Sequence, residues 1–297
     1  MKPAFSTVAC PTWTLDEVAR RASEWGYLGV DLRTFGSGSS MLACDPVLTA
    51  AEKVRAMFGA GGVEPMCLST SIRYDDPISP PVLGRTFLFD QESSVRESKS
   101  VIDAAVTLEC PFVRVFGFEI IGQEKRVSAI ARIAERLSKA LDYARSSGVS
   151  LVLENGGSFR TAAEMMEIID ELDHPLLAAA YSLPIAAAAG ESIGNGVNVL
   201  GERLVIAKVK DMSRGVPCLL GQGDLHAQDS IRALAAAGFK GWIVYEHDAA
   251  WLGTGTQGGR IEGVDTAAAL AHAARCLYEW AGHRRIESHP GSVVGRR

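Results

Sequence analysis

The chain has 297 residues, of which 47% are hydrophobic and 22% are charged, and its formal net charge is −5. This is the composition of an ordinary globular protein, and without a run of Lys and Arg a nucleic-acid partner is not expected. No stretch of 18 apolar residues predicts a membrane span, and the opening MKPAFSTVAC lacks the apolar core of a signal peptide, so we expect a cytoplasmic protein.

Short apolar runs alternate with longer amphipathic stretches along the chain. Several of the runs are apolar throughout, as strands covered on both faces are. Thr14 and Glu17 form a capping-box pattern at the start of the first helix, and Gly26 suits its end. We predict strands at 4–8, 28–33, 63–70, 112–116, 149–155, 176–182, 204–211 and 242–248. We predict helices at 14–26, 128–148, 161–172, 229–241 and 265–280.

This alternation predicts an α/β fold, a single (β/α)8 TIM barrel over residues 1–282 followed by a flexible C-terminal tail at 283–297. A doubly wound open sheet is the structural alternative. No GxGxxG motif follows an early strand, which disfavours the dinucleotide-binding form of that sheet.

The cysteines are scattered, and no CxxC motif occurs. We therefore expect reduced, mostly buried thiols and no zinc cluster built from them. They are Cys10, Cys44, Cys67, Cys110, Cys218 and Cys276.

Polar residues stand at the ends of the predicted strands, where the sites of TIM barrels are built. Long loops at 35–46 and 71–87 should lie at the same end. The polar residues are Asp31 and Arg33, Ser69 and Arg73, Arg114, Glu154 and Asn155, Ser182, Lys208, Lys210 and Asp211, and Glu246, His247 and Asp248.

The stretch RLVIAKVKDM carries two lysines in a strand that otherwise reads as core. Strand alternation places Ile206, Lys208 and Lys210 on one face. A buried ammonium is costly unless an anion pairs with it. If Glu154 and Glu246 point inward, the lysines face them across the barrel mouth.

Four segments resemble the xylose isomerase-like barrel family, which includes sugar isomerases and epimerases, inosose dehydratases and endonuclease IV-type enzymes. The segments are SEWGYLGVDLR, SLVLENGG, RLVIAKVKDM and LGQGDLHAQDSIRALAAAGFKGWIVYEHD. In sugar epimerases of this family, Glu, Asp, His and Glu from strands five to eight hold a divalent metal. The metal binds two adjacent substrate oxygens, and the two glutamates move a proton next to a carbonyl.

Only two of these four positions are kept. Glu154 matches the first ligand and Glu246 the last, but Ser182 stands at the Asp position and Lys208 at the His position. Protonated lysine is a poor ligand and serine a weak one. We therefore hypothesise that the ammonium of Lys208 replaces the metal, with Mn²⁺, Mg²⁺ or Zn²⁺ on the two glutamates as the alternative.

The resemblance implies an isomerase or epimerase that transfers a proton next to a carbonyl of a small keto-sugar, polyol or sugar acid. Glu154, Lys208 and Glu246 would be catalytic. A lyase or dehydratase on a related keto-sugar is one alternative, and a non-catalytic sugar-binding barrel, with Lys208 in a merely structural salt bridge, is another. A nucleic-acid repair enzyme is disfavoured, since it would need more histidines and a basic face.

Further residues are candidates for substrate binding. Arg33, Arg73 and Arg114 suit a carboxylate or phosphate because the guanidinium group forks onto such anions. Trp13 suits stacking on a sugar ring, with core packing as the alternative. By analogy with related barrels, a homodimer or homotetramer is left open. The full set is Asn155, Ser182, Lys210, Asp211, Arg33, Arg73, His226 and Trp13.

Overall fold

A computed structural model describes residues 1–34, 41–76, 92–251 and 265–282. The expected tail at 283–297, and the parts of the expected loops at 35–40 and 77–87, lie outside the described residues.

Eight parallel strands close into a barrel in the described residues, and neighbours follow the order β1-β10-β7-β6-β5-β4-β3-β2. Since β1 pairs with both β2 and β10, the sheet has no open edge, which confirms the TIM barrel and excludes the doubly wound sheet. The strands are β1 (Lys2–Ser6), β2 (Gly29–Arg33), β3 (Glu64–Arg73), β4 (Phe112–Phe116), β5 (Ser150–Glu154), β6 (Leu177–Ser182), β7 (Leu204–Val209) and β10 (Trp242–Tyr245).

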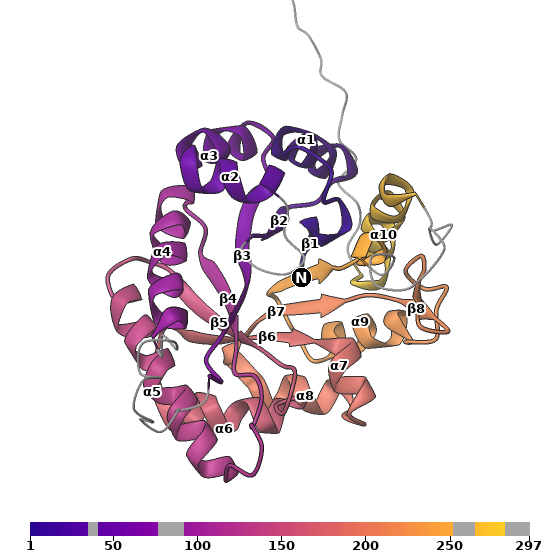
Figure 1. The fold of residues 1–297 in the computed structure, drawn as a ribbon. Coiled ribbons are helices and arrows are strands. Elements are labelled where there is room, and N and C mark those ends of the chain that lie inside the picture. Colours follow the sequence, from indigo (N-terminus) through magenta and orange to yellow (C-terminus); the bar gives the residue numbers. More distant parts are fainter. Residues whose placement is uncertain (35–40, 77–91, 252–264, 283–297) are drawn as a thin grey trace, which may run out of the picture.

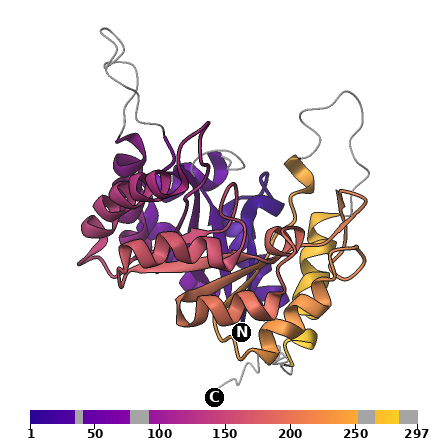
Figure 2. The same cartoon turned by 90° about the horizontal axis from the view of Figure 1, so that it is seen from below.

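Helices surround the barrel in chain order, as Figure 1 shows looking down its axis. Figure 2, turned by 90°, places the N-terminus at the end of the barrel where the parallel strands begin. The helices are α1 (Leu15–Trp25), α2 (Met41–Thr49), α3 (Ala51–Ala60), α4 (Ser93–Leu108), α5 (Arg126–Ala144), α6 (Ala162–Leu172), α7 (Leu183–Ala188), α8 (Ile193–Leu200), α9 (Ala227–Ala236) and α10 (Thr266–Trp280). Three short 3₁₀ turns, η1 (Thr7–Ala9), η2 (Gly201–Arg203) and η3 (Ala249–Trp251), and a hairpin of β8 (Met212–Ser213) and β9 (Val216–Pro217), complete the described elements.

The ends of α1 follow the sequence signals. The hydroxyl of Thr14 accepts a hydrogen bond from the backbone N–H of Glu17 at 3.3 Å. Gly26 has a φ of 81° and donates its N–H to the last carbonyls of the helix. This left-handed conformation is one that glycine adopts without steric cost, so the helix stops where the sequence predicts.

The barrel has two hydrophobic layers, one between strands and helices and a smaller one inside the barrel. Trp242 fills the inner layer near the start of the strands, and a Cβ at Gly29 would lie only 2.6 Å from its ring. Glycine at this position therefore makes room for the indole. The inner layer consists of Ala4, Met66, Cys67, Val152, Ala180, Ile206, Trp242 and Val244. Above it, toward the strand ends, the inward-facing side chains become charged.

Candidate active site

Lys208 lies inside the barrel among three carboxylates, two in other strands and one directly after β10. Its Nζ is 2.9 Å from Glu154 Oε2, 2.9 Å from Glu246 Oε1 and 3.5 Å from Asp31 Oδ2. The side chain is 1% exposed, so these anions, rather than water, surround the ammonium group. The alternation of β7 explains the placement: Ile206 and Lys208 point inward, while Ala207 and Val209 pack toward the helices.

The electrostatics of Lys208 favour its charged form. Burial alone would lower the pKa of Lys208, but the opposing attraction of Glu154 and Glu246 raises it above its ordinary value. Burial likewise works to raise the pKa of Glu246, and the charge of Lys208 and its hydrogen bond lower it instead. At neutral pH the described site therefore holds an ammonium ion between carboxylates.

Backbone pairing fixes the positions of the two glutamates. Glu154 is the last residue of β5 and pairs with Phe116 on β4 and Ala180 on β6. Glu246 directly follows β10, and its N–H donates to the carbonyl of Val209 at 2.9 Å, which extends the sheet ladder by one residue. Both carboxylates thus project from ordered sheet positions, which suits precise proton transfer.

Asp31 joins this cluster, although its place at a strand end was the only feature of the sequence that pointed to it. Its side chain is 1% exposed, and neither carboxylate oxygen makes a hydrogen bond among the described residues. The available signal was its inward register two residues before Arg33 on β2. Asp31 adds a third negative charge to the surroundings of Lys208.

Two arginines lie beside the carboxylates. Arg114 on β4 is 4% exposed, and its Nε lies 3.5 Å from Glu154 Oε2. Arg33 donates from its guanidinium to the carbonyl of Ser69 at 3.2 Å and to the hydroxyl of Ser71 at 2.8 Å. Burial and the nearby charge of Arg114 lower the pKa of Arg33 to about 10, against the opposing effect of the site carboxylates.

Asn155 and Ser182 hold two neighbouring strands together. The side-chain oxygen of Asn155 accepts the N–H of Ser182 at 2.6 Å, and its amide nitrogen donates to the carbonyls of Ser182 and Arg160. Asn155 is fully buried and these bonds occupy its amide. Ser182 pairs in register with Lys208, so it borders the charged cluster.

Lys210 and Asp211 have different surroundings. Lys210 Nζ pairs with Asp248 Oδ2 at 3.0 Å, toward the barrel mouth. Asp211 is 1% exposed and accepts backbone N–H groups from the loop that follows β7. These donors are Met212, Gly221, Gly223 and Leu225, at 2.8–3.3 Å. Asp211 therefore shapes this loop. His226 is exposed at the end of the loop and is the N-cap residue directly before α9.

The structure does not bring Trp13 or Arg73 into the charged cluster. Trp13 packs on Trp25 with ring centroids 6.2 Å apart, and Arg21 lies over its ring. Arg73 ends β3 with a half-exposed side chain that pairs with Asp75 at 3.4 Å.

The residues at the family's metal positions do not fit a metal ion. Glu154 and Glu246 supply oxygen ligands, but the protonated Nζ of Lys208 lies between them and has no lone pair to donate. Within the described ranges, no group of three His, Cys, Asp or Glu side chains is arranged to hold a metal.

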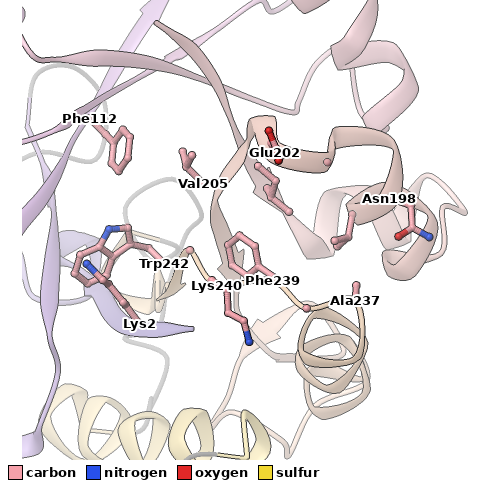
Figure 3. Close-up of a pocket in the computed structure, with 14 residues that line it drawn as sticks. Lys2, Phe112, Asn198, Glu202, Val205, Ala237, Phe239, Lys240 and Trp242 are labelled. Atoms are coloured by element: carbon pink, nitrogen blue, oxygen red, sulfur yellow. The ribbon is translucent and has the colours of Figure 1, made fainter. Parts of the chain in front are cut away.

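A cavity of about 700 Å³ opens at the opposite end of the barrel, lined by the first residues of four strands (Figure 3). Trp242, Phe112 and Phe239 form apolar walls, and Lys2 Nζ lies 4.7 Å from the Trp242 ring centroid. Trp242 precedes Glu246 by four residues of the same chain segment, a distance of roughly 13 Å along a strand. The cavity is therefore separate from the charged cluster.

A family model described as "Xylose isomerase-like TIM barrel" matches residues 19–280. No curated protein matches the sequence.

Among the described residues, none of the helices has the length and apolar character needed to span a membrane.

Several solved structures share the fold. D-psicose 3-epimerase from Clostridium cellulolyticum H10, solved with D-tagatose, is 14% identical with a TM-score of 0.74, covering 96% of this chain and 100% of that one. The IOLI protein with a bound zinc atom is 15% identical with a TM-score of 0.72, covering 95% and 98%. The "probable 3-DHS dehydratase AsbF" of petrobactin synthesis from Bacillus anthracis is 14% identical with a TM-score of 0.68, covering 93% and 98%.

Identities this low show a common fold and leave the reaction open. The family model, in contrast, spans most of the sequence, from α1 to the end of α10. The chain belongs to the xylose isomerase-like TIM barrel family.

Proposed function

We propose that this chain is an isomerase or epimerase that transfers a proton next to a carbonyl of a small keto-sugar, polyol or sugar acid without a metal. The observation that carries the proposal is the position of Lys208 Nζ, 2.9 Å from both Glu154 and Glu246. In the chain's metal-dependent relatives a cation would stand between these carboxylates, and here the chain supplies one itself.

Lys208 retains hydrogen-bonding capacity for a substrate oxygen. One N–H donates to Glu246 Oε1, while the 2.9 Å contact to Glu154 Oε2 lacks hydrogen-bond geometry and the 3.5 Å contact to Asp31 exceeds normal length. An ammonium group has three donors, so at least one is available to a carbonyl oxygen at the mouth. Such a donor stabilises the negative charge that develops on this oxygen.

The two glutamates carry the proton. In the first step the C–H bond next to the carbonyl breaks, the proton goes to one glutamate, and its electron pair forms the C=C bond of an enolate whose charge rests on the oxygen near Lys208. In the second step the other glutamate, after it takes up a proton from solvent, gives this proton to the opposite face of the same carbon, and the product is an epimer. If the enolate oxygen first takes the proton of the neighbouring hydroxyl group, the first glutamate can instead return its proton to the former carbonyl carbon; the neighbouring C–O⁻ becomes the new C=O, and the product is an isomer.

A lyase or dehydratase is the second candidate. It shares the first step. The enolate then regains its C=O, its electron pair forms a C=C bond to the neighbouring carbon, and the hydroxyl group on that carbon leaves as water with the proton held by a glutamate. The fold shared with the probable 3-DHS dehydratase makes this alternative worth testing in the same experiment. A new absorbance from a conjugated double bond would identify it.

The test is solvent exchange. The protein is incubated in D₂O and EDTA with a panel of keto-sugars and keto-acids of sugars, and NMR follows deuterium entering next to the carbonyl. We expect exchange in the wild type and its loss in Glu154→Gln and Lys208→Met. Exchange that appears only after Mn²⁺ or Mg²⁺ is added would restore a metal mechanism, and no exchange across the panel would favour a sugar-binding barrel.

A further inference from the structure

Two guanidinium groups converge at one side of the barrel mouth. Arg33 on β2 and Arg114 on β4 both pair in register with Ser69 on β3, the strand between them. Their Cα atoms are therefore roughly 10 Å apart, since neighbouring strands lie about 4.8 Å apart. The long side chains thus bring two positive charges to the same region of the mouth.

This convergence is electrostatically unfavourable by itself. Arg114 is 4% exposed and Arg33 is half-buried, so water screens their repulsion only in part. The lowered pKa of Arg33 has burial as its first cause and the charge of Arg114 as its second. An anion placed between the two groups would relieve the repulsion.

Both guanidinium groups are held in place. Arg33 is anchored through two nitrogens on Ser69 and Ser71, and its backbone N–H donates to the hydroxyl of Thr7 at 2.8 Å. The guanidinium of Arg114 stacks on the ring of Phe116, with its carbon 4.3 Å from the ring centroid. Stacking fixes the guanidinium plane and leaves its N–H edges to face hydrogen-bond acceptors.

The carboxylates of the cluster pair only weakly with Arg114. Its Nε is buried and makes no hydrogen bond among the described residues, and its contact with Glu154 is 3.5 Å long. Lys208, in contrast, lies 2.9 Å from two of the three carboxylates. The ammonium therefore takes the main part of the pairing with the glutamates, and Arg114 retains capacity for a further anion.

We infer that the substrate carries a carboxylate, which Arg33 and Arg114 bind together while its carbonyl oxygen lies at Lys208. This deepens the proposed function and rests on it: of the keto-sugars, polyols and sugar acids, it selects the sugar acids. A carboxylate matches the paired N–H groups of a guanidinium, and fixing this end of the substrate orients the carbonyl end toward Glu154 and Glu246.

The experiment compares matched acid and neutral ligands by isothermal titration calorimetry. The probes are D-fructuronate against D-fructose, and D-glucuronate against D-glucose. We expect the wild type to bind the acid of each pair at least about tenfold more tightly, the low end of what one charge-assisted hydrogen bond contributes. Arg114→Gln and Arg33→Gln should each reduce this preference to less than about threefold. Arg73→Gln, at an exposed arginine of the neighbouring strand, is the matched control and should keep the preference.

The outcomes separate this inference from the proposed function. Equal binding of acid and neutral ligands by the wild type overturns the inference, even if solvent exchange on neutral sugars shows that the proposed reaction occurs. Selective binding of acids that depends on Arg114, without any exchange, supports the inference and counts against the reaction. Since the first comparison needs only the wild type, it remains decisive if an arginine variant fails to fold. Inorganic phosphate is included as a competitor, and its displacing the acids at micromolar concentration would reassign the arginines to a phosphorylated substrate and overturn the carboxylate assignment.

Discussion

Lys208 and Glu246 contact one another across adjacent strands, although they are not partners in the ladder between β7 and β10. Val244 is the partner of Lys208 in the β10–β7 ladder, so Glu246 lies one inward position closer to the mouth, and the lysine side chain extends upward to reach it at 2.9 Å. The length of lysine makes this possible, because four methylene groups separate its nitrogen from the sheet. A cation at the mouth is thus anchored in the core.

Replacing Glu246 with Gln tests its role in proton transfer. The amide keeps the shape and can still accept a hydrogen bond from Lys208, but it cannot take up a proton. We expect the rate of solvent exchange to fall by about 10²–10⁴-fold, the usual contribution of a positioned general base. Glu202→Gln, at the cavity on the opposite end of the barrel, is the control and should leave the rate unchanged. A Glu246→Gln variant with wild-type exchange would remove this residue from the mechanism.

Replacing Lys208 with Met tests the energetics of the cluster. The variant leaves the buried carboxylates of Asp31 and Glu154 without their ammonium partner, and breaking a buried ion pair in this way costs about 3–5 kcal/mol of unfolding free energy. Urea denaturation measures the change. The exposed Lys240→Met should stay within about 0.5 kcal/mol of the wild type. A similar small change for Lys208→Met would mean that the carboxylates find other partners.

The pH dependence of stability should change in the same variant. In the wild type the pKa of Glu246 is lower in the folded state than in the unfolded chain, so its contribution is present above about pH 4.3 and is lost as the pH falls through the folded value. The raised pKa of Lys208 gives a contribution that is present below its unfolded pKa and is lost only as the pH rises through the folded value, well into the alkaline range.

Without Lys208, the effect of burial, which acts to raise the pKa of Glu246, is no longer opposed by the ammonium group, so protonation of Glu246 then stabilises the folded state. Thermal melts between pH 4 and 8 should therefore show the difference in stability between the wild type and Lys208→Met becoming smaller as the pH falls. Parallel curves for the two proteins would contradict this account.

Replacing Asp211 with Ala tests the loop after β7. Its carboxylate accepts four backbone N–H groups, and charged acceptors contribute about 1.5–3 kcal/mol per hydrogen bond, though not additively. We expect the amides of Gly221, Gly223 and Leu225 to lose hydrogen-exchange protection by at least about tenfold. Asp224→Ala removes a single bond, to the N–H of Arg214, and should leave these amides protected. Equal protection in the Asp211 variant would show that the loop is held by other contacts.

Much of the barrel follows from the sequence because strand periodicity is a local signal. The eight predicted strands overlap those of the structure, and inward alternation correctly places Lys208 inside. The first strand is observed at Lys2–Ser6 rather than 4–8, because Ser6 accepts the N–H of Val8 and starts a 3₁₀ turn. Helix α4 (Ser93–Leu108) was not predicted: it has no side-chain cap, and its apolar face includes the small polar residues Ser94 and Ser98.

The cluster around Lys208 was only partly predictable. Glu154, Lys208 and Glu246 could be grouped because each stands at the end of a strand with a family counterpart. The sequence alone does not group Asp31 and Arg114 with these residues, because their proximity depends on how β2, β3 and β4 pair in the folded sheet. For Asn155, position alone is a poor guide to the contacts of the side chain. Its place beside Glu154 predicts a ligand contact, whereas in the structure its amide nitrogen donates to the carbonyls of Ser182 and Arg160.

The ammonium group between Glu154 and Glu246 is covalently part of the polypeptide. Its stoichiometry is therefore set when the chain is synthesised, and neither dilution nor competition for trace elements can empty the position. A barrel built in this way keeps its central positive charge wherever the folded chain is found. This charge, however, cannot be replaced by an ion of different size or acidity.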